Sequence, residues 1–282
     1  LLQREQWPTT EQAFHMVHTP RDGLDLNKQS VAVRRLAYDE LLASQLALAL
    51  MRNRMTKAHG RVFNPKGDLK SHILEALPYA LTSSQAEAIS EIEDDLRGED
   101  RMLRLLQGDV GAGKTVVALL SMAHVVETGA QAVMMAPTEI LARQHLASIE
   151  PIAEKVGLTC AVLTGREKGK TREALLERLA AGEIDILLGT HALFQGGVEF
   201  KNLGLAVIDE QHRFGVHQRL SLAAKGITPD LLLMTATPIP RTLVLTYFGD
   251  MDVSKLTEKP PGRQPIQTNS MSLERLPELM ER

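Results

Sequence analysis

The sequence is poor in cysteine, with only Cys160 among 282 residues. One cysteine cannot form an internal disulfide, nor can it build a metal site from thiolates. It lies in the apolar run Thr-Cys-Ala-Val-Leu, where its simplest role is that of a buried strand residue. A disulfide framework and a cysteine-held metal are therefore excluded.

Long apolar runs are also lacking. The longest in the first half of the chain, residues 41–51, is far shorter than the roughly 20 residues of a membrane-spanning helix and is interrupted by Ser44 and Gln45. No signal peptide opens the chain. We therefore expect a cytoplasmic protein, and 44% hydrophobic residues are ample for a buried core.

Charge of one sign is not in excess, because 32 basic residues stand against 35 acidic ones and the net charge is -3. The overall charge therefore does not indicate nucleic-acid binding, which would have to come from local clusters. Two basic clusters are present, at residues 52–61 and 166–172, although such runs are usually solvated faces.

A phosphate-binding pattern, G-x-x-x-x-G-K-[ST], occupies residues 108–115 and follows the apolar run 102–106. Small residues allow main-chain N–H groups to wrap a triphosphate. Lys114 adds a charge for the outer phosphates, the following helix adds its positive end, and the Thr115 hydroxyl can bind Mg²⁺. The predicted nucleotide-binding loop consists of Gly108, Asp109, Val110, Gly111, Ala112, Gly113, Lys114 and Thr115.

Two acidic residues, Asp209 and Glu210, follow the apolar run 204–208. We predict that Asp209 holds Mg²⁺, and that Glu210 orients and deprotonates the water that attacks the γ-phosphate. A surface turn would explain one acid after a strand, but not two downstream of a phosphate loop. The predicted catalytic residues are Lys114, Asp209 and Glu210, and the predicted metal ligands are Thr115 and Asp209.

Continuous apolar runs recur between residues 102 and 235, with helical stretches between them. Such runs are typical of strands that are buried on both faces of a parallel sheet. We therefore predict an α/β fold with a doubly wound parallel sheet. The expected strands lie near residues 102–107, 132–136, 159–164, 184–189, 204–208 and 231–235.

Residues 28–59 contain no proline or glycine, and their apolar side chains recur at helical spacing. A helix of this length would extend about 48 Å, so we expect a strut between domains. A proline-rich stretch at 260–265 indicates a linker. We predict a helical connector at 1–60, a nucleotide-binding lobe at 61–258, and a linker with the start of another unit at 259–282.

Six motifs, in this order, resemble those of superfamily 2 helicases, and within that superfamily they are most similar to the bacterial members that act on branched DNA. The resemblance covers roughly residues 28–282 and implies a RecA-like P-loop lobe that uses ATP and Mg²⁺. The motifs are LTSSQ at 81–85, GDVGAGKT at 108–115, APTEILARQH at 136–145, GTHAL at 189–193, DEQH at 209–212 and TATPIPRTL at 235–243.

The resemblance also implies roles for individual residues. Thr82 and Gln85 would read the adenine, although Gln85 could be an ordinary helix residue. His191 could equally be a satisfied loop histidine, and His124 is expected in the core. The DNA-contact residues would be Pro137, Thr138, Gln144, Gly165, Arg166, Gly189, Thr190 and His191. The residues that couple the nucleotide to DNA would be His212, Arg213, Thr235, Ala236 and Thr237.

The chain departs from the family pattern at both ends. It starts at Leu1 and ends within what reads as a starting helix, so we expect a piece of a longer protein. The family's wedge domain and second motor lobe, with its arginine fingers, would be partners in the same full-length chain. The isolated piece should bind nucleotide but hydrolyse it poorly. The alternatives are a transcription-repair coupling translocase and a nucleotide-gated binding module without turnover.

Overall fold

The computed structural model describes residues 6–20, 27–56, 60–194, 196–209, 229–237, 251–258, 260 and 270–272, and side-chain surroundings are described for these except residues 48–56 and 194. Glu210, His212 and Arg213 lie outside the described residues, as does most of the predicted linker.

A seven-stranded sheet forms the centre of the lobe, and its strand order is β3-β4-β2-β5-β6-β1-β7. All six pairings of neighbouring strands are parallel, which confirms the predicted doubly wound α/β fold. The strands are β1 (Leu103–Gly108), β2 (Gln131–Met135), β3 (Cys160–Leu163), β4 (Ile186–Gly189), β5 (Leu203–Ile208), β6 (Asp230–Thr235) and β7 (Asp252–Leu256).

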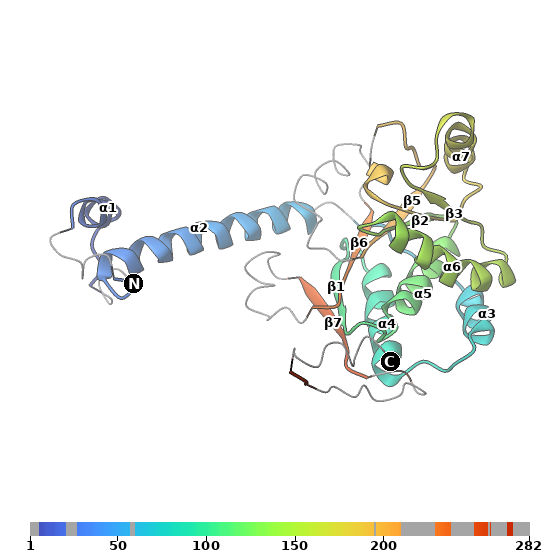
Figure 1. The fold of residues 1–282 in the computed structure, drawn as a ribbon, viewed down its shortest axis with the longest axis horizontal. Helices are drawn as coiled ribbons and strands as arrows, with labels where there is room; N and C mark the ends of the chain where they lie inside the picture. Colours follow the sequence, from blue (N-terminus) through green and yellow to red (C-terminus); the bar gives the residue numbers. More distant parts are fainter. Residues whose placement is uncertain are drawn as a thin grey trace.

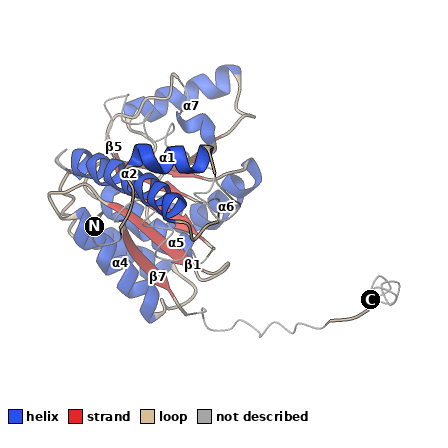
Figure 2. Ribbon diagram, turned by 90° about the vertical axis from the view of Figure 1, so that its left-hand side faces the viewer, coloured by secondary structure: helices blue, strands red, loops and turns tan. Residues whose placement is uncertain are grey.

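The apolar strands bury both faces of the sheet, because successive residues point to opposite sides. Leu106 packs into one core, whereas its neighbour Leu105 packs into the other. The first core includes side chains from α3 (Asp68–Ala76), α4 (Ser83–Leu96), α5 (Lys114–Val126) and α6 (Glu139–Lys155). The second includes side chains from α7 (Gly169–Ala181) and η1 (His191–Phe194), so helices lie on both sides of the sheet (Figure 2).

Two helices precede the lobe. In α1 (Thr10–His18), Thr9 and Gln12 form a reciprocal capping box, in which each side chain accepts from the other residue's main-chain N–H. The long helix α2 (Val31–Thr56) agrees with the predicted helix at 28–59, and it runs from α1 toward the lobe (Figure 1). Within the described part of the chain, none of the helices is long and apolar enough to cross a membrane.

Strand β7 is a feature that the sequence patterns did not predict. Its residues, Asp-Val-Ser-Lys-Leu, occupy two exposed, one half-buried and two buried positions and form no apolar run. Among the described residues, the strand lies at the edge of the sheet, where it pairs with β1. Ser254, in its middle, is buried and accepts a hydrogen bond of 3.0 Å from the Arg104 guanidinium. The sequence pattern of such an edge strand does not predict it, because its burial depends on neighbouring elements and not on an apolar run of its own.

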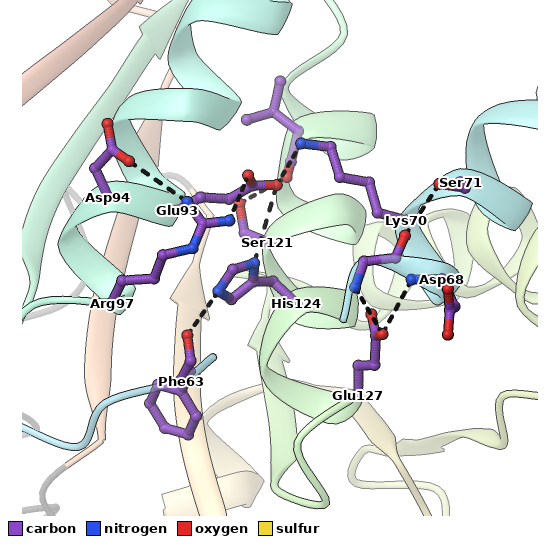
Figure 3. Close-up of polar contacts among 12 residues, drawn as sticks. Phe63, Asp68, Lys70, Ser71, Glu93, Asp94, Arg97, Ser121, His124 and Glu127 are labelled. Atoms are coloured by element: carbon purple, nitrogen blue, oxygen red, sulfur yellow. Dashed lines mark hydrogen bonds and ion pairs between the residues drawn. The ribbon is translucent and has the colours of Figure 1, made fainter. Parts of the chain in front are cut away.

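A buried carboxylate, Glu93, joins three helices on one face of the sheet (Figure 3). Its oxygens lie 2.6 Å from the Lys70 ammonium of α3 and 3.3 Å from the Arg97 guanidinium. His124 of α5 approaches to 3.9 Å, and its Nε2 lies 3.0 Å from the Phe63 carbonyl oxygen. Burial lowers the pKa of His124, and its buried position confirms the prediction that it belongs to the core.

Replacing Glu93 with alanine is expected to reduce the free energy of unfolding by about 1–2 kcal/mol, because it removes the buried carboxylate to which Lys70 and Arg97, whose side chains are 33% and 42% exposed, donate. Urea denaturation would measure the change. Asp94→Ala is the matched control, since Asp94 also pairs with Arg97 but its side chain is 73% exposed, and it should cost less than about 0.5 kcal/mol. Equal effects of the two substitutions would contradict a structural role for the buried cluster.

Candidate nucleotide and nucleic-acid site

The predicted site residues that the structure describes gather mainly at one edge of the sheet, beyond the carboxyl ends of its parallel strands. Ligands of open α/β sheets characteristically bind at this edge. The strand order divides the edge into two halves. The phosphate loop follows β1, Asp209 follows β5 and Thr235 ends β6, whereas the predicted DNA contacts follow β2, β3 and β4. The fold therefore separates the predicted nucleotide residues from the predicted DNA residues.

The phosphate loop connects β1 to α5. Gly111 and Gly113 have φ angles of 79° and 85°, in the left-handed region that favours glycine. Gly113 is also the N-cap residue of α5, and a Cβ atom there would lie 2.2 Å from the Gln85 Nε2 atom. Glycine at 113 is thus required both by the backbone conformation and by the side chain packed against it.

Lys114 is the first residue of α5, and its ammonium group lies over the loop. It donates hydrogen bonds of 2.6 Å to the Gly108 carbonyl and 3.1 Å to the Asp109 carbonyl. The charge is therefore held beside the main-chain groups that the predicted nucleotide site uses. Thr115 follows it in the first turn of α5 and is partly buried.

Gln85 connects the LTSSQ motif to the phosphate loop. Its Oε1 accepts a 2.9 Å hydrogen bond from the Thr82 main chain, and the Thr82 hydroxyl accepts one from the Gln85 N–H. Its Nε2 donates to the Ala112 carbonyl at 2.8 Å, and the residue is only 1% exposed. Gln85 is therefore a buried bridge. Recognition of adenine by Thr82 and Gln85 stays a prediction. The Gln85 carboxamide could still take part in it, because its N–H₂ and its oxygen each retain capacity for another hydrogen bond.

Strand β7 also brings Glu258 to the start of α4. The Glu258 carboxylate accepts hydrogen bonds from the main-chain N–H and the hydroxyl of Ser84, at 3.0 and 3.2 Å. These bonds lower the pKa of the Glu258 carboxyl. A carboxylate at a helix N-terminus also interacts favourably with the helix dipole. The end of β7 is thus tied to the motif that contains Gln85.

Asp209 lies directly after β5 and is 8% exposed. Its main-chain N–H donates to the Met135 carbonyl at 2.8 Å. Its Oδ2 atom lies 2.7 Å from Nε2 of His145, on α6. Sequence reasoning missed His145 as a site residue, although it ends the APTEILARQH motif, two helical turns after Thr138.

The TAT segment after β6 has its own hydrogen bonds. The hydroxyls of Thr235 and Thr237 are 3.0 Å apart, and the Thr237 N–H donates to the Thr235 hydroxyl. Gln107 of β1 donates to the Thr237 carbonyl at 3.3 Å. This segment therefore contacts the strand that leads into the phosphate loop. The coupling role predicted for Thr235, Ala236 and Thr237 stays a prediction.

On the other half of the edge, Thr138 caps α6 by accepting a hydrogen bond from the Leu141 N–H. Arg166, predicted to contact phosphates, has a side chain that is 73% exposed and lies 2.5 Å from Glu139. Arg143 bridges Glu139 and Glu167, at 3.2 and 2.7 Å. The structure therefore places an exposed arginine beside the start of α6, where a phosphate would compete with a carboxylate.

The remaining predicted DNA contacts lie at the ends of β2, β3 and β4. A Cβ atom at Gly189 would lie 2.1 Å from the Leu163 carbonyl oxygen, so glycine allows β3 and β4 to approach closely. Thr190 is buried and His191 is exposed at the start of η1. Pro137 is half-buried, whereas Gln144 and Gly165 are exposed. These residues are brought to the same half of the edge, and their contact with DNA stays a prediction.

The residues present fit Mg²⁺ and a nucleoside triphosphate. Glycines with positive φ at 111 and 113 shape the loop at the positive end of α5, where main-chain N–H groups can bind an anion. Thr115 supplies a hydroxyl and Asp209 a carboxylate, which are the hard oxygen ligands that Mg²⁺ prefers. These residue types are suited to such a site, and the binding of Mg²⁺ by Thr115 and Asp209 stays a prediction.

Residues 82–245 match the DEAD/DEAH box helicase family, which is more than half of the chain. The chain belongs to this family, as the motif resemblance predicted.

Within this family the chain is similar to ATP-dependent DNA helicase RecG. It is 44% identical over 281 residues to RecG of Streptococcus pneumoniae serotype 4, covering 99% of this chain and 41% of that protein. It is 48% identical over 266 residues to RecG of Bacillus subtilis strain 168, covering 93% of this chain and 38% of that protein. The chain thus spans about two fifths of the length of these curated relatives.

Solved structures agree with the fold. A structure of RecG bound to a three-way DNA junction has a TM-score of 0.80 and 40% identity, and the match covers 99% of this chain and 37% of that one. The DEAD-box helicase Mss116 bound to ssRNA and UDP-BeF has a TM-score of 0.53 at 19% identity, covering 69% of this chain and 44% of that one. The latter likeness shows the fold alone, and both support a RecA-like lobe.

Proposed function

We propose that this chain is the first motor lobe of an ATP-dependent DNA helicase of the RecG type, which remodels branched DNA such as forks and Holliday junctions in recombination and repair. The observation that carries the proposal is the divided edge of the sheet, with a phosphate loop and Asp209 on one half and the family's strand-contact motifs on the other. The similarity to RecG over nearly the whole chain supports the choice of branched DNA.

In this proposal the main-chain N–H groups of residues 108–113 bind the phosphates and Lys114 neutralises their charge. Thr115 and Asp209 would hold Mg²⁺, which when bound neutralises charge on the phosphate oxygens. Glu210 would orient the attacking water and accept its proton. Thr82 and Gln85 would read the adenine.

The predicted DNA-contact residues would bind one DNA strand through its phosphates. This contact is largely independent of sequence, as a translocase requires. His212 and Arg213, with the Thr235–Thr237 segment, would couple the state of the nucleotide to the binding of DNA. In the longer protein, a second motor lobe would supply the arginine that completes the ATP site, and a wedge domain would split the branched DNA.

A comparison of ATP turnover by this chain and by the full-length protein tests the proposal. We expect the chain to bind a fluorescent ATP analogue and to hydrolyse ATP negligibly, with or without forked DNA. The full-length protein should hydrolyse ATP faster when forked DNA is added. An absent arginine finger costs about 10³ to 10⁵ in rate in related phosphoryl transfers, so the difference should be unmistakable.

Three results would contradict parts of the proposal. Binding without turnover by the full-length protein, with or without DNA, would favour a nucleotide-gated binding module. Stimulation by unbranched duplex equal to that by forked DNA would favour a translocase of another kind, such as one coupled to transcription. Substantial DNA-stimulated turnover by this chain alone would mean that a second copy or another residue supplies the missing arginine.

A further inference from the structure

The contact between His145 and Asp209 lies at the boundary between the two halves of the sheet edge. Asp209 follows β5, and His145 belongs to α6, which follows β2. Strands β2 and β5 are neighbours in the sheet, and their meeting point separates the predicted DNA residues from the predicted nucleotide residues. This hydrogen bond therefore joins a predicted metal ligand to the helix that begins at Thr138, a predicted DNA contact.

The geometry is that of a strong, sheltered hydrogen bond. The His145 Nε2 and Asp209 Oδ2 atoms are 2.7 Å apart, and the two side chains are 14% and 11% exposed. An ionised carboxylate has no proton to donate, so the imidazole N–H is the donor. Hydrogen bonds to a charged acceptor are shorter and stronger than neutral ones. The Asp209 side chain is thus held by a donor that water only partly reaches.

The imidazole comes from a firmly packed helix. Ala142, Ile149 and Ala153 of α6 are almost completely buried, and Ile149 and Ala153 belong to the core that includes α3, α4 and α5. At the other end of the contact, the Asp209 main chain is fixed to β2 by its bond to Met135. The contact with His145 of α6 and the main-chain bond to Met135 of β2 therefore both help to fix the orientation of the carboxylate.

We infer that His145 is a positioning residue that sets the orientation in which the Asp209 carboxylate meets Mg²⁺·ATP, and that it makes this orientation depend on the position of α6. The inference rests on the proposed function, since it takes Asp209 as a metal ligand. An ionised carboxylate can accept about four bonds, so a hydrogen bond at Oδ2 is compatible with metal coordination. Partners that orient a metal ligand typically change metal affinity by about 10- to 100-fold when removed.

The same contact offers a route between DNA and nucleotide. Thr138 caps α6, and the neighbouring Glu139 pairs with Arg166 at 2.5 Å. A DNA phosphate that draws Arg166 away from Glu139 would act on the first turn of the helix that carries His145. Any effect of DNA on metal binding must be matched by an equal effect of metal on DNA binding, because coupling between two sites is reciprocal.

The test is the affinity for Mn²⁺, used as a spectroscopic substitute for Mg²⁺, in the full-length protein saturated with ADP. Electron paramagnetic resonance of free Mn²⁺ gives this affinity without turnover. His145→Leu, which removes the donor but keeps an apolar body, should weaken Mn²⁺ binding about 10- to 100-fold. His145→Gln, which keeps an N–H donor at similar reach, should lie closer to wild type. Ser148→Ala is the matched control on the same helix, because the exposed Ser148 hydroxyl donates to the Gln144 carbonyl of its own helix.

The outcomes separate this inference from the proposed function. Wild-type Mn²⁺ affinity in His145→Leu, together with a lowered melting temperature, would show that His145 is only a packing residue, and would overturn the inference. If His145→Leu fails to fold, the comparison of His145→Gln with the shorter His145→Asn decides instead, and equal affinities of those two would overturn it. The proposed function fails separately, if wild-type turnover does not respond to forked DNA while Mn²⁺ still binds.

Forked DNA provides a second readout. In wild type, adding DNA should change the affinity for Mn²⁺, and in His145→Leu this change should disappear while DNA binding itself remains. A structural role alone would not remove the response to DNA. An unaltered response in His145→Leu would contradict the dependence on α6.

Discussion

Replacing Lys114 with alanine is expected to weaken the binding of ATP by this chain about 100-fold. The ammonium group lies over the phosphate loop, 2.6 Å from the Gly108 carbonyl, where it can meet the outer phosphates. Hydrogen bonds to charged groups contribute about 1.5–3 kcal/mol each, and a factor of 100 corresponds to about 2.7 kcal/mol. Titration with a fluorescent ATP analogue would measure the loss.

Two controls separate charge from packing. Lys114→Met keeps the length and apolar stem of the side chain but removes the charge, and we expect it to bind as weakly as Lys114→Ala. Lys155→Ala removes a lysine from the last turn of another helix, α6, and should leave the affinity for ATP unchanged. Unchanged affinity in Lys114→Ala would refute the assignment of residues 108–115 as the phosphate loop.

Replacing Gly113 with alanine is expected to reduce ATP affinity by at least about tenfold, or about 1.4 kcal/mol. A Cβ atom at this position would lie 2.2 Å from Gln85 Nε2, so the Gln85 carboxamide would be forced away from the Ala112 carbonyl. The backbone also has a φ angle of 85°, which costs an L-residue about 1–2 kcal/mol. The loop would therefore lose both its conformation and its connection to α4.

Gly157→Ala is the matched control for Gly113→Ala. Gly157 has a similar φ of 78°, but a Cβ atom there would meet nothing within 4 Å. It should lower the melting temperature through backbone strain alone and leave nucleotide binding intact. If the contact with Gln85 is the cause, Gly113→Ala should cost less affinity in a Gln85→Ala background than in the wild type, and a double-mutant cycle measures this. Additive losses would show that Gln85 does not mediate the effect.

Features that depend on residues close together in the chain could be predicted from the sequence alone. Apolar runs that continue without alternation predicted the strands of a parallel sheet, and six of the seven strands lie where they were expected. The capping residues Thr9 and Gln12 act within one helical turn. The glycines and Lys114 of the phosphate loop are also local, because their pattern describes one strand, one turn and one helix start.

Contacts between distant segments could not be predicted from local patterns, because they depend on how the elements pack. Strand β7 was missed because its residues carry no apolar run, and its burial comes from its contacts with β1 and α4 and from Arg104. The bond from Gln85 to Ala112 joins residues from two different motifs. The pairing of His145 with Asp209 spans 64 positions and exists because β2 and β5 are neighbours in the sheet. Strand order follows from how whole faces pack against one another, and local periodicity does not encode it.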